Sequence, residues 1–275
     1  MKKLVFFIAL TLLAVCLVGG SVALAAESEE TVEVYDYVYV TIADEKGNSV
    51  LAYEEIILED ADGDGVVTMH DALICAHEQK YQGGADGYAA EVTAFGHSMT
   101  KLWGCENGGG YGYYLNNDSP QSLADPVETG DHIVAFVYTD TVAFSDTYCY
   151  FDPYHVAVTG DEPLTLTLYT LGFDEEWNTV SVPLAGAVIS IDGKTTSYVT
   201  NEDGKVTITF DGAGICTLTA HKEGMILVPP VCTVAVNGEA ADAGDRNAIL
   251  LWVAFGTVAF LPLIPLWRKI RRAKL

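Results

Sequence analysis

Oxygen-bearing side chains recur at alternate positions in one short stretch of the chain, residues 60–71. Its sequence is Asp-Ala-Asp-Gly-Asp-Gly-Val-Val-Thr-Met-His-Asp. A Ca²⁺ ion takes roughly six to eight oxygens, and a twelve-residue loop supplies them from positions 1, 3, 5, 7, 9 and 12. The spacing therefore predicts a calcium site with glycine at the turn, Gly65, and ligands from Asp60, Asp62, Asp64, the Val66 carbonyl, Thr68 and Asp71.

The last position of this loop departs from the usual pattern. Asp71 stands where a bidentate Glu is common. The run Asp-x-Asp-Gly-Asp-Gly-Val-Val-Thr-x-x-Asp resembles the EF-hand-like loop of dockerin modules. Dockerins carry two such loops and this sequence shows one, so an ordinary Asp/Gly surface turn is the alternative.

Regular elements on both sides should position the loop. β-Branched and aromatic residues from Thr31 to Ile42 and from Val50 to Leu58 predict two strands. Thr68 followed three residues later by Asp71 forms a capping-box pattern, which predicts a helix to about Lys80. Calcium would then fasten a strand to a helix, which is a structural role.

A glycine- and aromatic-rich segment follows the predicted helix and is the expected place for ligand contacts. Its flat side chains could stack on a ring or a sugar face, although half of them could equally belong to the core. The candidate ligand-binding residues are Trp103, Tyr111, Tyr113, Tyr114 and Asn116.

Histidines offer weaker alternatives. His70 and His77 are seven residues apart and could share a helix face, but no carboxylate completes a transition-metal set. His97 with Met99, or either of them with Tyr111, could supply axial ligands to a haem. No nucleophile elbow or other catalytic set accompanies them, so we predict that the chain is not an enzyme.

The first half of the exterior chain resembles a bacterial surface domain family related to the C-terminal domain of transcobalamin. The resemblance covers about residues 32–138 and rests on the segments Gly-Tyr-Tyr-Leu-Asn-Asn, residues 112–117, and Gly-Asp-His-Ile, residues 130–133. It implies a β-grasp-like domain, set at residues 31–160, and a surface for a corrinoid-like or other small ligand. It implies no reaction.

Short alternating strands separated by Gly-containing turns follow at residues 161–236, a pattern typical of an antiparallel sandwich. The segment resembles bacterial Ig-like or carboxypeptidase-regulatory-like modules, which usually act as spacers. The expected fold class is therefore mainly β with one short helix: a β-grasp-like α+β domain, an Ig-like β-sandwich and a C-terminal transmembrane helix.

Both ends of the chain carry export and membrane signals. Residues 1–26 have the basic start, apolar stretch and Ala-x-Ala site of a signal peptide. After a linker at 237–247, residues 248–267 are uncharged and long enough to span a bilayer, and a basic tail follows at 268–275. This predicts a single-pass cell-membrane protein with its body outside. A sorting signal is the alternative, but no Leu-Pro-x-Thr-Gly motif precedes the apolar run.

Between these ends the chain is strongly acidic. Residues 27–245 hold six lysines, no arginine and all 38 acidic residues, so the formal charge is 6 − 38 = −32. Nucleic acid is excluded as a partner because it requires a cationic surface. Five cysteines remain after the signal peptide, an odd number; Cys216 and Cys232 are close enough for a bridge, and unpaired thiols are the alternative.

Together these features predict a calcium-stabilised extracellular protein that captures a small ligand. The alternative is a cell-surface adhesion or scaffolding module that binds protein or glycan.

Overall fold

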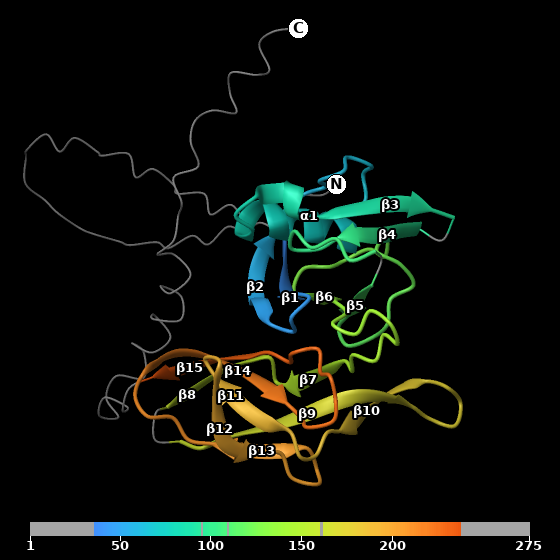
Figure 1. Cartoon of the computed structure of the whole chain (residues 1–275). Helices are drawn as coiled ribbons and strands as arrows, with labels where there is room; N and C mark the ends of the chain where they lie inside the picture. Colours follow the sequence, from blue (N-terminus) through green and yellow to red (C-terminus); the bar gives the residue numbers. More distant parts are fainter. Residues whose placement is uncertain (1–35, 95, 109, 160–161, 238–275) are drawn as a thin grey trace, which may run out of the picture. The chain divides into compact units, whose positions relative to one another are not determined.

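The computed structural model describes residues 36–237, apart from 95, 109, 160 and 161 (Figure 1). The described residues all belong to one compact unit. They are mainly β-strands, with one α-helix and one 3₁₀ helix among the described residues, as the sequence predicts for fold class.

No helix within this described part is both long and apolar enough to cross a membrane. The predicted signal peptide, the linker beyond Asn237, the apolar segment 248–267 and the basic tail lie outside the described residues.

The first sheet has the strand order β2-β1-β6-β5. Its strands are β1 (Tyr37–Ala43), β2 (Ser49–Ile57), β5 (Tyr111–Leu115) and β6 (His132–Val137). The central strands β1 and β6 run parallel, while β2 and β5 pair antiparallel at the edges. All six residues of β6 are buried because both faces of the sheet are covered there: Ile133, Ala135 and Val137 join one core, and Val134 and Phe136 join another.

Helix α1 (Met69–Lys80) packs against this sheet. Its buried residues Met69, Leu73 and Ala76 recur at helical spacing and share a core with Val38 and Val40 of β1. The predicted helix is confirmed, and it begins at the residue after Thr68.

A short 3₁₀ helix, η1 (Gly84–Gly87), and a two-stranded hairpin follow α1. The hairpin consists of β3 (Ala89–Thr93) and β4 (Gly96–Lys101). Met99 of β4 is buried in the same core as α1, whereas Val92 of β3 is 81% exposed. Of the two hairpin strands, β4 is therefore the one that packs on this core, close to Met69 at the start of α1.

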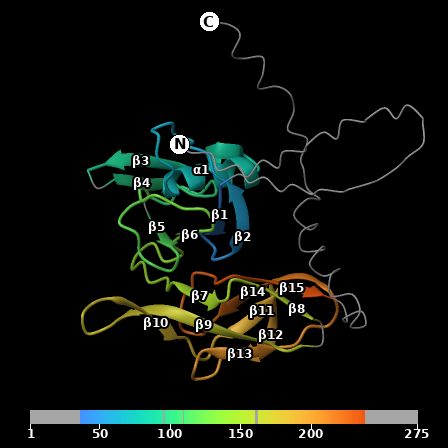
Figure 2. The same cartoon turned by 180° about the vertical axis from the view of Figure 1, so that it is seen from behind.

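The second group of strands forms two further sheets, which Figure 2 shows from behind. One has the order β10-β9-β13, with β7 also paired to β9; the other has the order β12-β11-β14-β15-β8. The strands are β7 (Cys149–Asp152), β8 (His155–Thr159), β9 (Leu164–Phe173), β10 (Thr179–Pro183), β11 (Val188–Ile191), β12 (Lys194–Val199), β13 (Lys205–Ile208), β14 (Gly214–His221) and β15 (Cys232–Asn237).

These two sheets share one hydrophobic core. Leu164, Leu166 and Leu168 alternate inward along β9, and they join Ile189 and Leu218 of the other sheet. The alternating apolar and Thr residues of the sequence thus become the inner and outer faces of a strand.

Strands β7 and β8 precede residue 161, where the sequence led us to expect a new domain. They nevertheless pair with β9 and β15 of the second group. The parallel partner of β8 lies far ahead in the chain, so no local pattern signals this pairing.

All five cysteines of the described chain are free thiols. Cys216 pairs across the strands with Val234, and Cys232 pairs with Leu218. The two cysteines are therefore diagonal neighbours, not opposite each other, and the bridge considered from the sequence is not formed.

Candidate functional site

The acidic loop between β2 and α1 is organised by its own carboxylates. Asp60 accepts hydrogen bonds from the backbone N–H groups of Gly63, at 2.8 Å, and Gly65, at 2.9 Å. Asp62 and Asp64 each accept one from the residue two positions later. Gly65 has φ +96°, a left-handed conformation that glycine adopts without strain. The loop thus turns sharply at the predicted position.

Asp71 joins the loop to the helix. Its buried carboxylate accepts hydrogen bonds from the backbone N–H groups of Ala61, Asp62 and Thr68 and from the Thr68 hydroxyl, at 2.8–3.1 Å. Burial alone would raise the pKa of Asp71, but the hydrogen bonds from Thr68, Asp62 and Ala61 favour the carboxylate and lower it.

The structure brings only some of the predicted calcium ligands together. Carboxylate oxygens of Asp60, Asp62 and Asp71 lie within 4.8 Å of one another. Asp64 is not part of this group. Thr68 is buried and directs its hydroxyl to Asp71.

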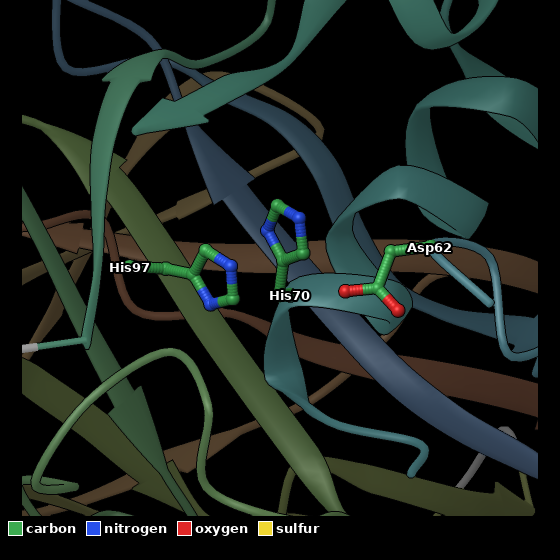
Figure 3. A group of neighbouring side chains, drawn as sticks. All are labelled: Asp62, His70 and His97. Carbon is green, nitrogen blue, oxygen red and sulfur yellow. The ribbon is translucent and has the colours of Figure 1, made fainter. Parts of the chain in front are cut away.

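A second group, which the sequence did not predict, lies beside the first. Asp62, His70 and His97 also place one ligand atom each within 4.8 Å of one another (Figure 3). The two imidazole rings stack with centroids 4.2 Å apart and planes 6° apart. Burial, and then the proximity of His97, lower the pKa of His70 despite nearby carboxylates. Because 27 residues separate the two histidines, no motif spacing could have revealed this group.

His77, the other helix histidine, lies in the core and not at either site. Its Nδ1 is 2.7 Å from the Leu73 carbonyl oxygen, and its Nε2 accepts a hydrogen bond from the Trp103 backbone N–H at 3.0 Å. Both ring nitrogens are therefore used, and the paired site considered for His70 and His77 is absent from the described structure.

The five predicted ligand-binding residues do not form one surface. Trp103 packs against His77 and Tyr81, and the Tyr111 hydroxyl donates to the backbone oxygens of Thr100 and Cys105. Tyr113 packs on the first core, whereas Tyr114 stacks on Tyr148, with ring centroids 3.7 Å apart.

Asn116 has a structural role at the end of β5. Its side-chain amide donates to Asp131, and its side-chain oxygen accepts the His132 backbone N–H. It also has φ +50°, in the left-handed region where asparagine is enriched. These contacts hold the end of β5 against the start of β6 and explain why an asparagine stands there.

Tyr111 and Tyr113 do share an open cavity of about 440 Å³. Its remaining lining residues are Thr93, His97, Ser98, Met99 and Gln121. Its volume falls within the range of about 300–1,000 Å³ that ligand pockets commonly occupy. His97 therefore belongs both to the cavity lining and to the Asp62, His70 and His97 group.

Comparisons with known proteins do not assign the chain to a family. No family model matches, and no curated protein matches. Among solved structures, a chain described as "Structural basis for Dscam isoform specificity" matches with 14% identity over 41% of this chain and 26% of its own, at a TM-score of 0.23. The N-terminal four Ig domains of Dscam1 isoform 4.4 match with 10% identity over 77% of this chain and 45% of their own, at 0.21.

The chain thus spans less than half the length of these solved chains. TM-scores of this size do not demonstrate a shared fold.

Proposed function

We propose that the chain is a non-enzymatic binding protein of the cell surface that captures a small ligand in the cavity beside β4 and β5. The observation that carries this proposal is the convergence of Tyr111, Tyr113, Met99 and His97 on a cavity of about 440 Å³. Aromatic and thioether groups offer apolar contact, while His97 and Gln121 offer polar contact, which is the usual mixture in small-ligand sites.

The proposed fold of the cavity-bearing part is β-grasp-like. The order β2-β1-β6-β5, with a parallel central pair and a helix after the first hairpin, supports this proposal. For the second group we propose an Ig-like sandwich that acts as a spacer, supported by two sheets around one core.

In this proposal, calcium in the loop from Asp60 to Asp71 holds the β2–α1 connection, and the apolar segment 248–267 anchors the chain in the cell membrane. The calcium assignment is supported by the hydrogen bonds from the backbone of the loop to its own carboxylates, which gather these side chains around the turn. The uncharged sequence and its basic tail support the second.

Ligand titration tests the proposed binding. We would add a corrinoid, and separately haem, to the purified full chain in detergent and record the visible absorbance. Binding is expected to shift the spectrum in a saturable way. Gln121→Trp should weaken it, because the larger side chain takes space in the cavity, whereas Gln82→Trp on an exposed loop should leave it unchanged. Flat titrations with both compounds would reject these ligands.

A second candidate function is adhesion to a protein or glycan. The β9–β10 hairpin exposes two aromatic side chains, Phe173 at 67% and Trp177 at 81%, with ring centroids 6.1 Å apart. Exposed aromatic groups are enriched at recognition surfaces. Retention of the full chain on cell-wall glycan, lost in Trp177→Ala and kept in Val142→Ala, would favour this function over small-ligand capture.

A further inference from the structure

We propose that Asp62, His70 and His97 form a binding site for a divalent transition metal of the zinc type, which shares Asp62 with the acidic loop and His97 with the lining of the cavity. The three side chains come from three separate elements: the acidic loop, the first turn of α1 and the start of β4. Their ligand atoms already lie within 4.8 Å of one another (Figure 3).

The chemistry of the three donors selects the type of metal. Two imidazoles and one carboxylate suit zinc and its neighbours in the first transition row, whereas Ca²⁺ prefers oxygen ligands only. Three protein ligands also match zinc sites in which a water or another small ligand takes the fourth position. The acidic loop alone, without the histidines, offers no such preference.

His70 is held in place before any metal arrives. Its Nδ1 is 2.9 Å from the hydroxyl of Tyr88, a residue only 7% exposed. Its backbone N–H donates to the Leu123 carbonyl at 2.9 Å, which fixes the first turn of α1. A histidine that ligates a metal through one nitrogen almost always uses the other in such a contact, so Nε2 of His70 is the ligating atom.

His97 supplies a different observation that points to a ligand. Its Nδ1 is buried and has no hydrogen-bond partner, which is also true of Nδ1 of His132, but His97 in addition lies within reach of the ligand atoms of Asp62 and His70. Buried polar atoms are nearly always paired, and an exception calls for a specific cause such as an ion. The backbone of His97 is held in the hairpin, where His97 of β4 pairs with Val92 of β3.

Metal binding requires a small rearrangement of one ring. Because the rings are parallel, a single ion cannot lie in both ring planes, where the nitrogen lone pairs point. His97 is the ring expected to turn about its Cβ–Cγ bond, since its Nδ1 has no hydrogen bond to break. A tetrahedral zinc with bonds of about 2.0–2.1 Å needs its ligands roughly 3.3 Å apart, so the group must contract slightly.

Asp62 can serve this site without leaving its turn. One of its carboxylate oxygens, Oδ1, accepts the Asp64 backbone N–H at 3.0 Å, and Oδ2 is the oxygen assigned to the metal. Asp62 also belongs to the group with Asp60 and Asp71, so the metal site and the calcium loop meet at this residue.

Zinc titration of the untagged full chain in detergent, followed by calorimetry, tests the proposal. One equivalent of zinc should bind. His97→Ala should weaken the zinc affinity about tenfold or more, because a loss of that size is typical even when only a residue that supports a ligand is removed. His221→Ala is the matched control, because His221 is an exposed strand histidine outside the group. The His221→Ala variant should bind zinc with the same affinity as the unchanged chain.

Two further measurements keep the test decisive. His97→Asn, which retains a polar side chain of similar size, guards against a folding defect, and circular dichroism must match the unchanged chain. Cobalt(II) in place of zinc should give visible absorption bands that His97→Asn abolishes. Absence of saturable zinc binding, or equal affinity in the His97 and His221 variants, would overturn the proposal.

Discussion

At the scale of single residues, two buried histidines contribute to the pH dependence of stability. His77 is fully buried, and burial lowers its pKa to about 4 although the Leu73 carbonyl partly opposes the change. His132 lies 2.9 Å from the Thr41 hydroxyl through Nε2, and burial lowers its pKa to about 3. Both residues are therefore neutral in the folded chain at pH values where the unfolded chain already protonates them.

This difference predicts acid destabilisation that begins well above the carboxylate range. The unfolded pKa of histidine is about 6.5, so the unfolded chain binds more protons than the folded chain as the pH falls from 6.5 toward 4. Each of the two histidines should remove about 1.4 kcal/mol of unfolding free energy per pH unit in that window. Denaturant unfolding at pH 7, 6 and 5 measures the slope.

His77→Gln is the informative variant. Glutamine carries a donor and an acceptor, as the contacts with Leu73 and Trp103 require, but it does not titrate. The slope should fall by about 1.4 kcal/mol per pH unit relative to the unchanged chain. His155→Gln, at an exposed position on β8, should keep the full slope, and equal slopes in all three proteins would contradict the assignment to His77.

At the scale of elements, the connection between β2 and α1 is held mainly by carboxylates. Asp71 in the helix accepts bonds from Ala61 and Asp62 in the loop, while Gln79 near the helix end bonds both the N–H and the carbonyl of Ile57 in β2. The helix is thus tied to the acidic loop at its start and to β2 near its end. A cation within the loop would neutralise carboxylates that otherwise repel one another.

Calcium removal should accordingly lower the melting temperature of the full chain. A ligand present at about 100 times its Kd stabilises the folded state by about 2.7 kcal/mol, which EGTA would remove. Asp60→Asn should melt at the lower temperature and should not respond to EGTA, because it loses a carboxylate of the loop. Asp118→Asn, at an exposed turn outside the loop, should respond like the unchanged chain. A melt that EGTA leaves unchanged would remove the calcium assignment.

Elements were predictable from the sequence where their pattern is local. The helix predicted from its capping box to end at Lys80, the second strand and the alternating strand at Leu164 to Tyr169 are confirmed. Each of these predictions depends only on residues that are close together in the sequence. The parallel pairs were not predictable, since Tyr39 meets His132 and Val156 meets Val234 across long stretches of chain. The same limit applies to His70 and His97, whose proximity depends on how β4 packs beside α1.

Aromatic residues show a second limit of sequence reasoning. Tyr113 and Tyr114 look alike in the sequence, but neighbouring residues of a strand face opposite sides. Tyr113 therefore joins the first core and the cavity, while Tyr114 stacks on Tyr148. The predicted ligand surface therefore grouped two tyrosines that lie on opposite faces of β5.

At the scale of the whole molecule, charge is strongly unbalanced. Residues 27–245 carry 38 acidic residues against six lysines. Among the described residues three ion pairs form, and they involve the lysines Lys46, Lys80 and Lys101. The acidic residues thus far outnumber the cations that could pair with them, and the resulting self-repulsion opposes the compact state.

Salt should therefore stabilise the folded chain. Raising sodium chloride from about 20 mM to 500 mM shortens the screening length from roughly 20 Å to 4 Å, which weakens the repulsion between exposed carboxylates. A gain of about 1–2 kcal/mol would raise the melting temperature by roughly 3–6 °C for a domain of this size. Tetramethylammonium chloride should act equally, because screening depends on ionic strength and not on a specific sodium site. A melting temperature that stays flat or falls with both salts would show that local carboxylate contacts outweigh the overall charge.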